Sequence, residues 1–589
     1  MTIELDPAPA GVIRHAARHE DELALDSPRG HTANLASLFA ERVERHPDRT
    51  ALVVPRTWDD RRVAAADELS FGALAGMVGA WQYHLRAQGV HPGDRVLVLV
   101  PPSLDLYAPA LAVLASGMSL VLVDPGMSLS RARAAVATSA PAAVIFGHRA
   151  RHLVTTIPEL RRIPKRIPAD ARPSRPGAAM DIVARRSDDE AIVSFTSGST
   201  GRPKGADRTH GLLLAQHRSL TRAFPYVDGD VDMTAWPVVV LHDLLSGIPS
   251  VLPPMRPGKF RQVPGAAALR FAAEHGVTLL NGPPAFLDSV LRTADWTGIT
   301  PALRRIITGG GPVHPQLCRQ VLSAFEGADG CVLYGGTEAE PISWCAMEDV
   351  IAAGGAGAGC DRPGLGGAGL LVGRPVDDIA VRIFPLDPAA PAAGPAAPSE
   401  RDGTWGEVGV RGDHVLARWI APGGGRRQLD PGAWLRTGDV ARFDTDGRLW
   451  LGGRISDTVT HAGRTIHPYV VESVLDGIPG IRRSAVMQGS RGRADVYLDC
   501  TPTRDGEPQP QRAARIALDS LGLSSARLYW PARLPVDGRH NSKVDRPRLR
   551  ARRGQIIAAA AVRRIVPPGA ARGHRHARPV PAAPEEPRQ

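Results

Sequence analysis

The sequence predicts an α/β protein whose large N-terminal domain contains two βαβ-type subdomains plus a small β-barrel, followed by a smaller α+β C-terminal domain. Two stretches predict the subdomains, because helical segments alternate with short apolar runs over residues 68–150 and again after residue 200. This alternation is typical of a largely parallel sheet covered by helices. From Gly406 to Phe443 the pattern changes to short strands with turns, which indicates the β-barrel. After Gly452, segments compatible with helices and with strands are mixed, which indicates the C-terminal domain.

The first subdomain is expected to begin with a helix over Leu35–Glu44 and to continue as three helix–strand pairs. The expected helices are Phe71–Gly89, Tyr107–Ser116 and Ser130–Ser139, and the expected strands are Arg95–Val100, Leu120–Val123 and Ala143–Phe146. These strand segments are short and rich in Val and Leu, as strands buried on both faces of a parallel sheet are.

The second subdomain is expected to repeat this pattern between residues 212 and 334. The expected helices are Leu212–Phe224, Ala266–His275, Pro284–Arg292 and His314–Phe325, and the expected strands are Val277–Leu280, Arg304–Thr308 and Gly330–Tyr334. Two stretches rich in Gly, Pro and Ala, residues 352–369 and 385–398, are interpreted as flexible surface insertions.

The composition is that of a globular protein with a sizeable core. Of 589 residues, 43% are hydrophobic and 22% charged, and the longest apolar runs are too short to span a membrane. The five cysteines are scattered, with no CxxC pair or Cys/His cluster. This argues against structural zinc and a disulfide framework, and it favours a reducing, cytoplasmic location.

The net charge of +11 is concentrated at the C-terminus. Residues 551–589 hold eight arginines and two glutamates, which gives +6 and leaves +5 for the rest of the chain. This segment is also rich in Pro and Ala without apolar periodicity, so we interpret it as a disordered, solvated tail. A tether for nucleic acid or a membrane surface is the alternative, and we do not expect nucleic acid to be a partner.

Lysine is rare in this chain. Only Lys165, Lys204, Lys259 and Lys543 occur among 71 basic residues. A lysine ammonium is a compact point charge that a planar guanidinium does not replace at a crowded anionic site. The few lysines retained therefore point to candidate functional positions.

The strongest motif is Ser194–Gly205, SFTSGSTGRPKG, which follows an apolar β run. Its small residues are Thr196, Ser197, Gly198, Ser199, Thr200 and Gly201, and Lys204 closes it. Glycines allow close backbone approach, and successive N–H groups with hydroxyls can surround phosphate oxygens. The spacing is not that of a Walker A loop. We interpret the segment as a phosphate-binding loop.

This loop resembles the signature of the adenylate-forming superfamily, which includes acyl-CoA synthetases, luciferases and the adenylation domains of peptide synthetases. Five further segments resemble the family's motifs in the family's order: Thr308–Pro312 (TGGGP), Tyr334–Glu338 (YGGTE), Thr437–Asp439 (TGD), Gly453–Arg454 and Lys543 within LPVDGRHNSKVDR. The resemblance covers roughly residues 35–550, and six motifs in order make it specific.

The resemblance implies ATP and Mg²⁺ as cofactors and a role for each motif. It implies that Gly309, Gly310 and Gly311 lie against adenine and that Tyr334 stacks on it. It further implies that Thr337 contacts the α-phosphate, that Glu338 reaches Mg²⁺, and that Asp439 and Arg454 bind the ribose. Lys543 falls at the family's catalytic C-terminal lysine, and Lys204 belongs to the phosphate loop. Lys165 and Lys259 match no motif.

The same resemblance sets the expected domain boundaries. Residues 1–30 form a loose leader, 31–453 the large adenylation domain, 454–456 a hinge, 457–550 a mobile C-terminal lid domain, and 551–589 the basic tail. Rotation of the lid domain about the hinge would carry Lys543 into and out of the site between two reaction steps. Residues Trp236–Gly247 and Asn281–Phe286 are expected to form the acyl pocket.

Several departures from the common pattern bear on the second step. Val240 stands where many acyl-CoA synthetases have a histidine, Ser456 stands at the hinge position that is commonly Asp or Lys, and Lys543 follows VDGRHNS. Together with TEAEPIS after Tyr334, these details resemble the β-lactone synthetases of bacterial olefin biosynthesis. That branch implies a β-hydroxy acid whose own hydroxyl attacks the activated carbonyl and expels AMP.

Three alternatives stay open. The adenylate can be captured by the thiol of coenzyme A or of a carrier protein, or by an amine. A nucleotide- or nucleic-acid-binding protein without catalysis would be expected to have lost catalytic positions. Lys204, Glu338, Asp439 and Lys543 are all present.

Overall fold

The computed structural model describes residues 33–124, 127–171, 173, 179–196, 204–256, 259–294, 300–355, 369–386, 403–421, 425–430, 432–501, 510–531, 533–537 and 542–556. The proposed leader, residues 197–203 of the phosphate loop, most of both proposed insertions and the tail beyond residue 556 lie outside these ranges.

An eight-stranded sheet forms the first subdomain, in the order β19-β18-β8-β7-β4-β3-β5-β6. Its strands are β3 (Arg95–Leu99), β4 (Ser119–Leu122), β5 (Ala143–Phe146), β6 (Lys165–Pro168), β7 (Glu190–Thr196), β8 (Lys204–Thr209), β18 (Arg418–Ile420) and β19 (Arg426–Gln428). Strands β3 to β7 are parallel, whereas β8, β18 and β19 pair antiparallel. The parallel strands confirm the βαβ prediction for this subdomain.

A thirteen-stranded sheet forms the second subdomain, with its strands in the order β16-β17-β20-β21-β15-β14-β13-β12-β11-β9-β10-β1-β2. Its strands are β1 (Thr50–Trp58), β2 (Val63–Ser70), β9 (Asp232–Thr234), β10 (Ser250–Val251), β11 (Leu279–Gly282), β12 (Arg305–Gly309), β13 (Asp329–Gly336), β14 (Ala339–Ala346), β15 (Leu370–Pro375), β16 (Ala380–Pro385), β17 (Gly406–Arg411), β20 (Leu435–Phe443) and β21 (Leu449–Arg454). The run from β13 through β12, β11, β9 and β10 to β1 is parallel. The carboxyl ends of these strands therefore lie along one edge.

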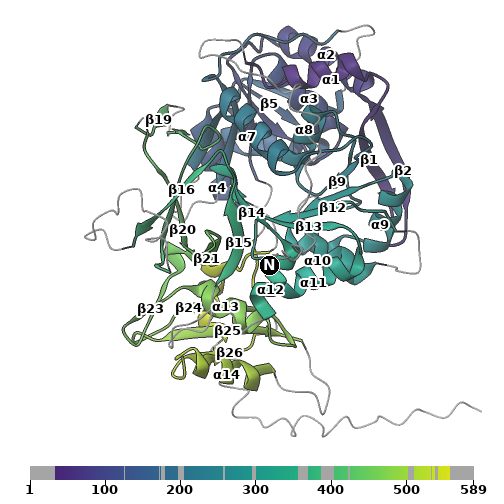
Figure 1. The fold of residues 1–589 in the computed structure, drawn as a ribbon. Coiled ribbons are helices and arrows are strands. Elements are labelled where there is room, and N and C mark those ends of the chain that lie inside the picture. The colour runs from purple at the N-terminus through teal and green to yellow at the C-terminus, as the bar shows by residue number, and fades with distance from the viewer. Residues whose placement is uncertain are drawn as a thin grey trace, which may run out of the picture.

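Helices pack beside both sheets (Figure 1). They are α1 (Ser37–Arg45), α2 (Phe71–Ala87), α3 (Leu104–Ala115), α4 (Leu129–Ser139), α5 (Arg151–Thr156), α6 (Pro158–Arg161), α7 (His210–Ala223), α8 (Pro237–Ser246), α9 (Gly265–Glu274), α10 (Pro284–Thr293), α11 (Pro315–Ala324) and α12 (Met347–Gly355), with 3-10 turns η2 (His148–Ala150), η3 (Ala169–Ala171) and η4 (Phe260–Gln262). Residues 352–355 belong to α12, so the first proposed insertion begins too early. Met347 and Val350 are buried and fix this helix to the core.

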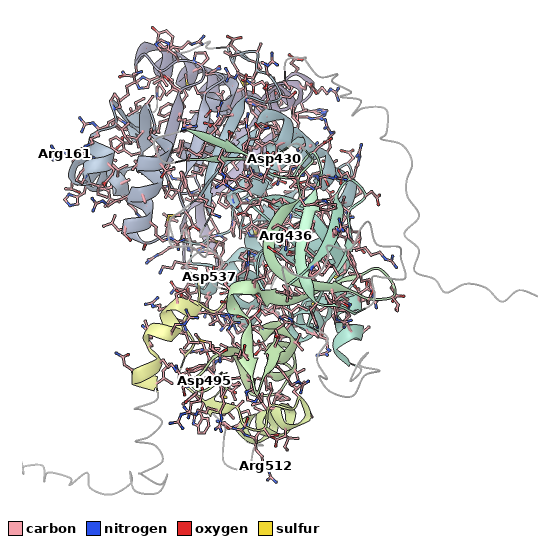
Figure 2. All side chains as sticks on the ribbon, turned by 90° about the vertical axis from the view of Figure 1, so that its left-hand side faces the viewer. Arg161, Asp430, Arg436, Asp495, Arg512 and Asp537 are labelled. Atoms are coloured by element: carbon pink, nitrogen blue, oxygen red, sulfur yellow. The ribbon has the colours of Figure 1, made fainter. Side chains whose placement is uncertain are left out.

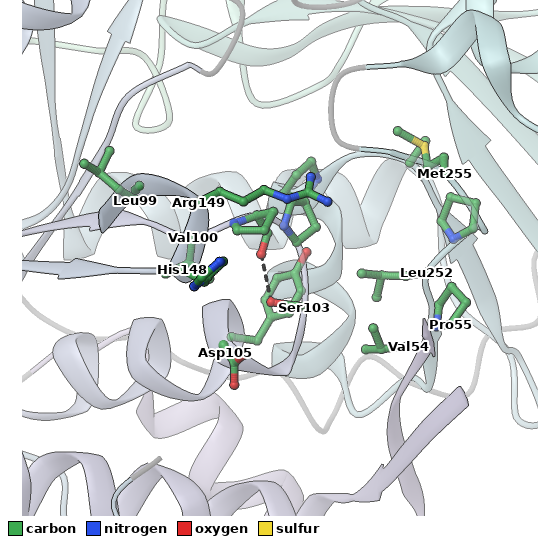
Figure 3. A pocket seen from close by; sticks show the side chains of 18 of the residues that line it. Val54, Pro55, Leu99, Val100, Ser103, Asp105, His148, Arg149, Leu252 and Met255 are labelled. Atoms are coloured by element: carbon green, nitrogen blue, oxygen red, sulfur yellow. Dashed lines mark hydrogen bonds between the residues drawn. The ribbon is translucent and has the colours of Figure 1, made fainter. Parts of the chain in front are cut away.

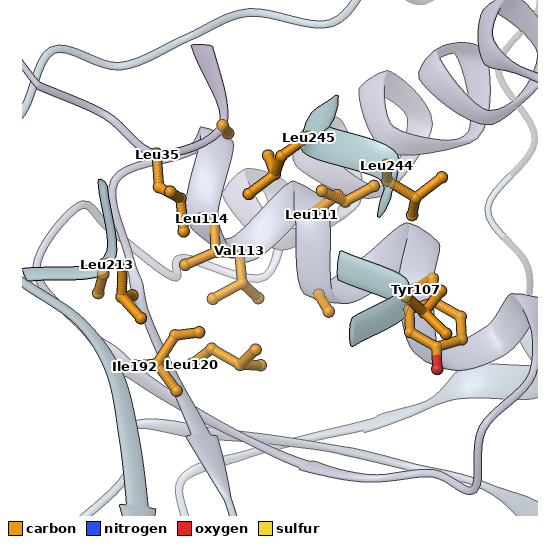
Figure 4. Packing of buried hydrophobic residues seen from close by; sticks show 14 of the residues in the cluster. Leu35, Tyr107, Leu111, Val113, Leu114, Leu120, Ile192, Leu213, Leu244 and Leu245 are labelled. Atoms are coloured by element: carbon orange, nitrogen blue, oxygen red, sulfur yellow. The ribbon is translucent and has the colours of Figure 1, made fainter. Parts of the chain in front are cut away.

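The apolar helix α3 joins the two subdomains. Leu111, Val113 and Leu114 are fully buried, and Figure 4 shows them between Leu120 of β4 and Leu244 of α8. Replacing such a leucine by alanine typically costs about 2–5 kcal/mol of stability. This packing fixes the relative position of the two sheets and hence of the loops at their carboxyl edges.

The C-terminal domain has its own small core and lies below the large domain in Figure 1. It contains η6 (Ile455–Asp457), β22 (Val459–His461), β23 (Arg464–Ile466), α13 (Pro468–Asp476), β24 (Ile481–Gln488), β25 (Ala494–Cys500), α14 (Pro510–Ser520), β26 (Arg527–Tyr529) and α15 (Arg546–Ala551). After α15, Arg553 forms a 2.7 Å ion pair with the buried Asp495. None of the helices that the structure describes is long and apolar enough to cross a membrane.

Candidate active site

The TGGGP segment is the turn at the carboxyl end of β12. A side chain on Gly309 would place its Cβ 2.3 Å from the carbonyl oxygen of Leu333 on β13, so only glycine fits there. Gly310 has φ = +70°, a conformation that glycine adopts without strain. Thr308 is buried, and its hydroxyl has no hydrogen-bond partner among the described residues. The turn therefore exposes backbone at the strand end and leaves a polar atom available beside it.

The YGGTE segment is a tight hairpin between β13 and β14. Gly336 pairs with Ala339, which leaves Thr337 and Glu338 as the two turn residues, both half-buried. Because β12 and β13 are adjacent and parallel, the hairpin lies next to the TGGGP turn. The structure thus brings Tyr334, Thr337 and Glu338 to the strand end beside Gly309–Gly311.

A hydrogen-bonded trio joins this hairpin to the neighbouring antiparallel strands. The Tyr334 hydroxyl donates to Oδ2 of Asp439 at 2.8 Å, and Nε of Arg454 lies 2.9 Å from Oδ1 of Asp439. Asp439 on β20 and Arg454 on β21 are direct cross-strand partners. Arg454 also donates to the carbonyl of Thr437 at 2.8 Å. A carboxylate can accept about four hydrogen bonds, so Asp439 keeps capacity for a ligand's hydroxyl groups.

The charge of Asp439 raises the pKa values of both of its partners in the trio. The Asp439 carboxylate raises the pKa of Arg454 against the effect of burial, and the Glu338 carboxylate also contributes. Burial and then Asp439 hold the pKa of the Tyr334 hydroxyl well above its usual range. Tyr334 is therefore a neutral donor and Arg454 a permanent cation, and Glu338 lies close enough to Arg454 to contribute to the local field.

The phosphate-loop prediction falls largely on residues that the structure does not describe. Its two ends are described, however, because Thr196 at the end of β7 pairs with Lys204 at the start of β8. The two strands thus hold the ends of the loop together, and Lys204 is exposed. Ser194, within β7, has a buried hydroxyl without a partner among the described residues. Ser197, Gly198, Ser199, Thr200 and Gly201 lie outside the described residues.

The segment carrying Lys543 is fixed by Asp537. One carboxylate oxygen of Asp537 accepts hydrogen bonds from the backbone N–H groups of Ser542 at 2.9 Å and Lys543 at 2.8 Å. The N–H of Asp537 in turn donates to the Lys543 carbonyl at 2.8 Å. Figure 2 places Asp537 at the junction of the large and C-terminal domains.

Ser542 docks this segment onto the large domain. The backbone N–H of Ala285 donates to the Ser542 hydroxyl at 3.3 Å, and a Cβ on Gly311 would lie 2.5 Å from the Cβ of Ser542. Gly311 thus provides the space that lets the Lys543 segment approach the TGGGP turn. The structure brings Lys543 to the same edge as Gly311, although these residues are 232 positions apart in the sequence.

A second contact across the domains involves two groups that burial keeps neutral. Nε2 of His314, at the start of α11, lies 3.2 Å from Oδ2 of Asp476 at the end of α13. Burial lowers the pKa of His314 to about 4 and raises that of Asp476 to about 7. Between these values the contact is a hydrogen bond between neutral groups, which avoids the cost of burying a charge pair.

Arg546 connects the Lys543 segment to the hinge region. Its buried guanidinium contacts Glu472 at 2.7 Å and Asp457 at 3.2 Å, and it donates to the carbonyl of Val486 at 2.6 Å. Arg546, Asp537, Ser542 and the His314–Asp476 pair were not predicted from the sequence. Only the polar run VDGRHNS gave a signal, since Asp537 and Ser542 lie within it.

A buried polar cluster lies behind the expected acyl-pocket segment. Asp243 on α8 accepts from the hydroxyls of Tyr226 and Ser250, each at 2.8 Å, and Asn281 donates to Asp232 at 2.6 Å. Asp232 and Asp243 lie close enough for the charge of Asp243 to raise the pKa of Asp232. Burial raises both pKa values, that of Asp243 to about 7.

His242, on the same helix, pairs with His217 of α7. Their Nδ1 atoms are 2.8 Å apart, so one ring donates to the other. Burial lowers the pKa of His242 to about 4. The pair is a neutral packing contact between α7 and α8.

The described residues contain no group of three or more His, Cys, Asp or Glu side chains suited to a metal ion. Glu338 is the carboxylate that the sequence assigns to the metal ion. This donor set fits Mg²⁺, which is commonly held by one or two carboxylates together with substrate phosphates and water.

Comparisons with known proteins agree with these motifs. The model of the AMP-binding enzyme family matches residues 39–418. An olefin β-lactone synthetase from Stenotrophomonas maltophilia is 30% identical over 88% of this chain and 97% of its own length, and one from Xanthomonas campestris is 29% identical over 88% and 96%.

Among solved structures, O-succinylbenzoate coenzyme A synthetase (MenE) from Bacillus subtilis, in complex with ATP and magnesium ion, has the same fold. The TM-score is 0.67 at 21% identity, over 88% of this chain and 100% of that one. The chain belongs to the AMP-binding enzyme family and is an adenylate-forming acid ligase.

Proposed function

We propose that the protein activates a β-hydroxy acid as its acyl-AMP and then closes the acyl group to a β-lactone. The observation that carries the adenylating half is the docked Lys543 segment, which reaches Ala285 and Gly311 beside the Tyr334–Asp439–Arg454 trio. This docking supports the proposal, because it brings the backbone of Lys543 to the strand ends that carry Tyr334 and Gly311.

In the adenylating step, a carboxylate oxygen of the substrate attacks the α-phosphorus of ATP, and the bond to the β-phosphate oxygen breaks to release pyrophosphate. Asp439 accepts from the ribose hydroxyls, with Arg454 beside it, while Tyr334 lies against adenine. Thr337 contacts the α-phosphate. Lys543 places its ammonium where negative charge gathers in the transition state, the strategy that usually dominates such transfers.

The remaining phosphates are assigned to the loop between β7 and β8. Residues 196–204 would enclose the β- and γ-phosphates, and Lys204 would offset the charge of the leaving pyrophosphate. Glu338 would hold Mg²⁺, which supplies charge neutralisation at the phosphate oxygens when bound.

In the second step, the β-hydroxyl oxygen attacks the acyl carbonyl carbon, the bond from that carbon to the AMP oxygen breaks, and the hydroxyl proton passes to solvent. Both reacting groups belong to one molecule, so no second substrate is needed. The enzyme contributes by holding the hydroxyl oxygen close to the carbonyl carbon. Support comes from the two olefin β-lactone synthetases at 29–30% identity and from the departures at Val240, Ser456 and VDGRHNS.

Incubation with ATP, Mg²⁺ and β-hydroxy acids, with and without coenzyme A, tests this function. We expect AMP release and a product lighter than the acid by one water without coenzyme A. Products that require added coenzyme A, carrier protein or amine would instead identify a thioester- or amide-forming ligase.

A further inference from the structure

A cavity of about 540 Å³ lies between the two sheets of the large domain. Loops at the carboxyl ends of β3 and β5 line one side, and the ends of β1, β9 and β10 line the other. In Figure 3, Leu99, Val100 and His148 face Val54, Leu252 and Met255 across it. Its volume is typical of small-molecule sites, and ligands of open α/β sheets bind at the carboxyl ends of strands.

The lining of the cavity is mainly apolar. Val54, Pro55 and Leu252 are buried in its wall, and most of the surface presented to it is carbon. Arg149 and His148, which also line it, are exposed, and Asp105 is half-buried. An interior of this kind favours a hydrocarbon chain, because burying a methylene group strengthens binding by about fourfold.

The cavity adjoins the candidate active site through one pair of strands. Ala235, in its wall, donates its N–H to the carbonyl of Asn281 at 2.9 Å. Asn281 is four residues before Ala285, whose N–H contacts Ser542 beside Lys543. Strand β9, which leads into the cavity wall, is two strands from β12 in the sheet. That separation is about 10 Å at the usual strand spacing.

We infer that this cavity receives the apolar tail of the acid, with Ala150 and Met255 limiting its length. The inference rests on the proposed activation of a β-hydroxy acid at the β12–β13 edge. Short acids do not reach the cavity, which is two strands away. A long alkyl chain passes the hydrogen-bonded residues Ala235 and Asn281 and enters it. Neither Ala150 nor Met255 belongs to the motifs assigned to the nucleotide.

Two variants that narrow the cavity from opposite sides test the inference. Ala150→Trp acts from η2 and Met255→Trp from the segment after β10, and both positions are half-buried. Ala137→Trp, on the exposed side of α4 and outside the cavity, is the matched control. ATP–pyrophosphate exchange is measured for each protein with 3-hydroxybutanoate and with 3-hydroxytetradecanoate.

We expect the wild type to prefer the long acid by at least about 100-fold in kcat/KM, as several buried methylenes would give. Each narrowing variant should reduce this ratio at least tenfold, with less than a twofold change for the short acid. Ala137→Trp should leave the ratio unchanged. An unchanged ratio in both narrowing variants overturns the inference.

Binding of dodecanoate without ATP, measured by calorimetry, separates the cavity from the reaction. Dodecanoate binding by the wild type that both narrowing variants lose supports the cavity assignment. A wild type that exchanges pyrophosphate with no hydroxy acid would contradict only the proposed function, and the binding result would still support the cavity. Absence of dodecanoate binding to the wild type, or equal binding by the narrowing variants, overturns the inference.

Discussion

The hydroxyl of Ser542 accepts a 3.3 Å hydrogen bond from the backbone N–H of Ala285 and thereby joins the Lys543 segment to the first turn of α10. With Asp537 holding the backbone of Ser542 and Lys543, this contact fixes the C-terminal domain on the carboxyl edge of the large sheet. The arrangement suits the proposed adenylating step, because the Lys543 segment approaches the strand ends that carry the motifs assigned to the nucleotide.

Replacing Lys543 should abolish adenylation while ATP still binds. The ammonium acts on charge that develops in the transition state, so Lys543→Ala should reduce ATP–pyrophosphate exchange by at least about 100-fold. ATP binding is followed by calorimetry in the same protein. Lys259→Ala, a change at an exposed lysine outside every motif, is the control. Normal exchange by the Lys543 variant would overturn its assignment.

Closing the space at Gly311 should impair adenylation without changing a charged group. A Cβ there would overlap Ser542, so Gly311→Ala should displace the Lys543 segment and slow exchange by about 100-fold, as a displacement of about 1 Å can do. Ser542→Gly removes the clashing atom, so the double variant should recover most of the lost rate. If the double variant is as slow as Gly311→Ala, docking at Gly311 is not the cause.

The Tyr334–Asp439–Arg454 trio predicts a graded effect on ATP binding. Asp439→Ala removes the acceptor for both neighbours and should raise the KM for ATP by about 100-fold. Tyr334→Phe removes one hydrogen bond to a charged group and should raise that KM by about tenfold. Steady-state kinetics at saturating acid measure both effects. A larger effect from Tyr334→Phe would contradict the central place given to Asp439.

The buried carboxyls of Asp232 and Asp243, whose pKa values are raised, predict a pH-dependent stability. A carboxyl whose pKa is raised in the folded state contributes stability that is complete below about pH 4 and is lost as the pH rises through about 7. In Asp232→Asn a neutral amide replaces the carboxyl whose pKa is raised by burial and by Asp243. The melting temperature of the variant relative to wild type should therefore rise between pH 5 and pH 8.

The exposed Asp60→Asn serves as the control for this measurement. The stability difference between Asp232→Asn and the wild type should grow by at most about 1.4 kcal/mol per pH unit. A difference that is constant from pH 5 to pH 8 would show that the pKa of Asp232 is not raised in the folded protein.

Sequence periodicity identified the elements that lead to the site. The strand over 143–146 agrees with β5, and the helices over 71–89 and 314–325 agree with α2 and α11 within two residues at each end. The hairpin of β1 and β2 was not predicted, because β2 carries polar residues on a largely exposed strand. Its pairing with β1 is set by neighbouring strands that lie far away in the sequence.

Motifs predicted candidate nucleotide-binding residues, several of which the structure brings together, but they did not predict how these residues contact one another. The Tyr334–Asp439 bond spans 105 residues and the Ala285–Ser542 bond spans 257. Such pairs depend on the order of strands in the sheet and on docking of the C-terminal domain, which no local pattern contains. The electrostatic coupling of Asp232 with Asp243 could not be predicted for the same reason, since each acid alone is an ordinary polar residue.

The central claim concerns what leaves the enzyme when a β-hydroxy acid is adenylated. Mass spectrometry of products from ATP, Mg²⁺ and 3-hydroxytetradecanoate, without coenzyme A, carrier protein or amine, tests it most directly. We predict one AMP released for each molecule of product, and a product lighter than the acid by the mass of water. Acyl-AMP that accumulates without this product, and is consumed only when a thiol or an amine is added, would contradict β-lactone formation.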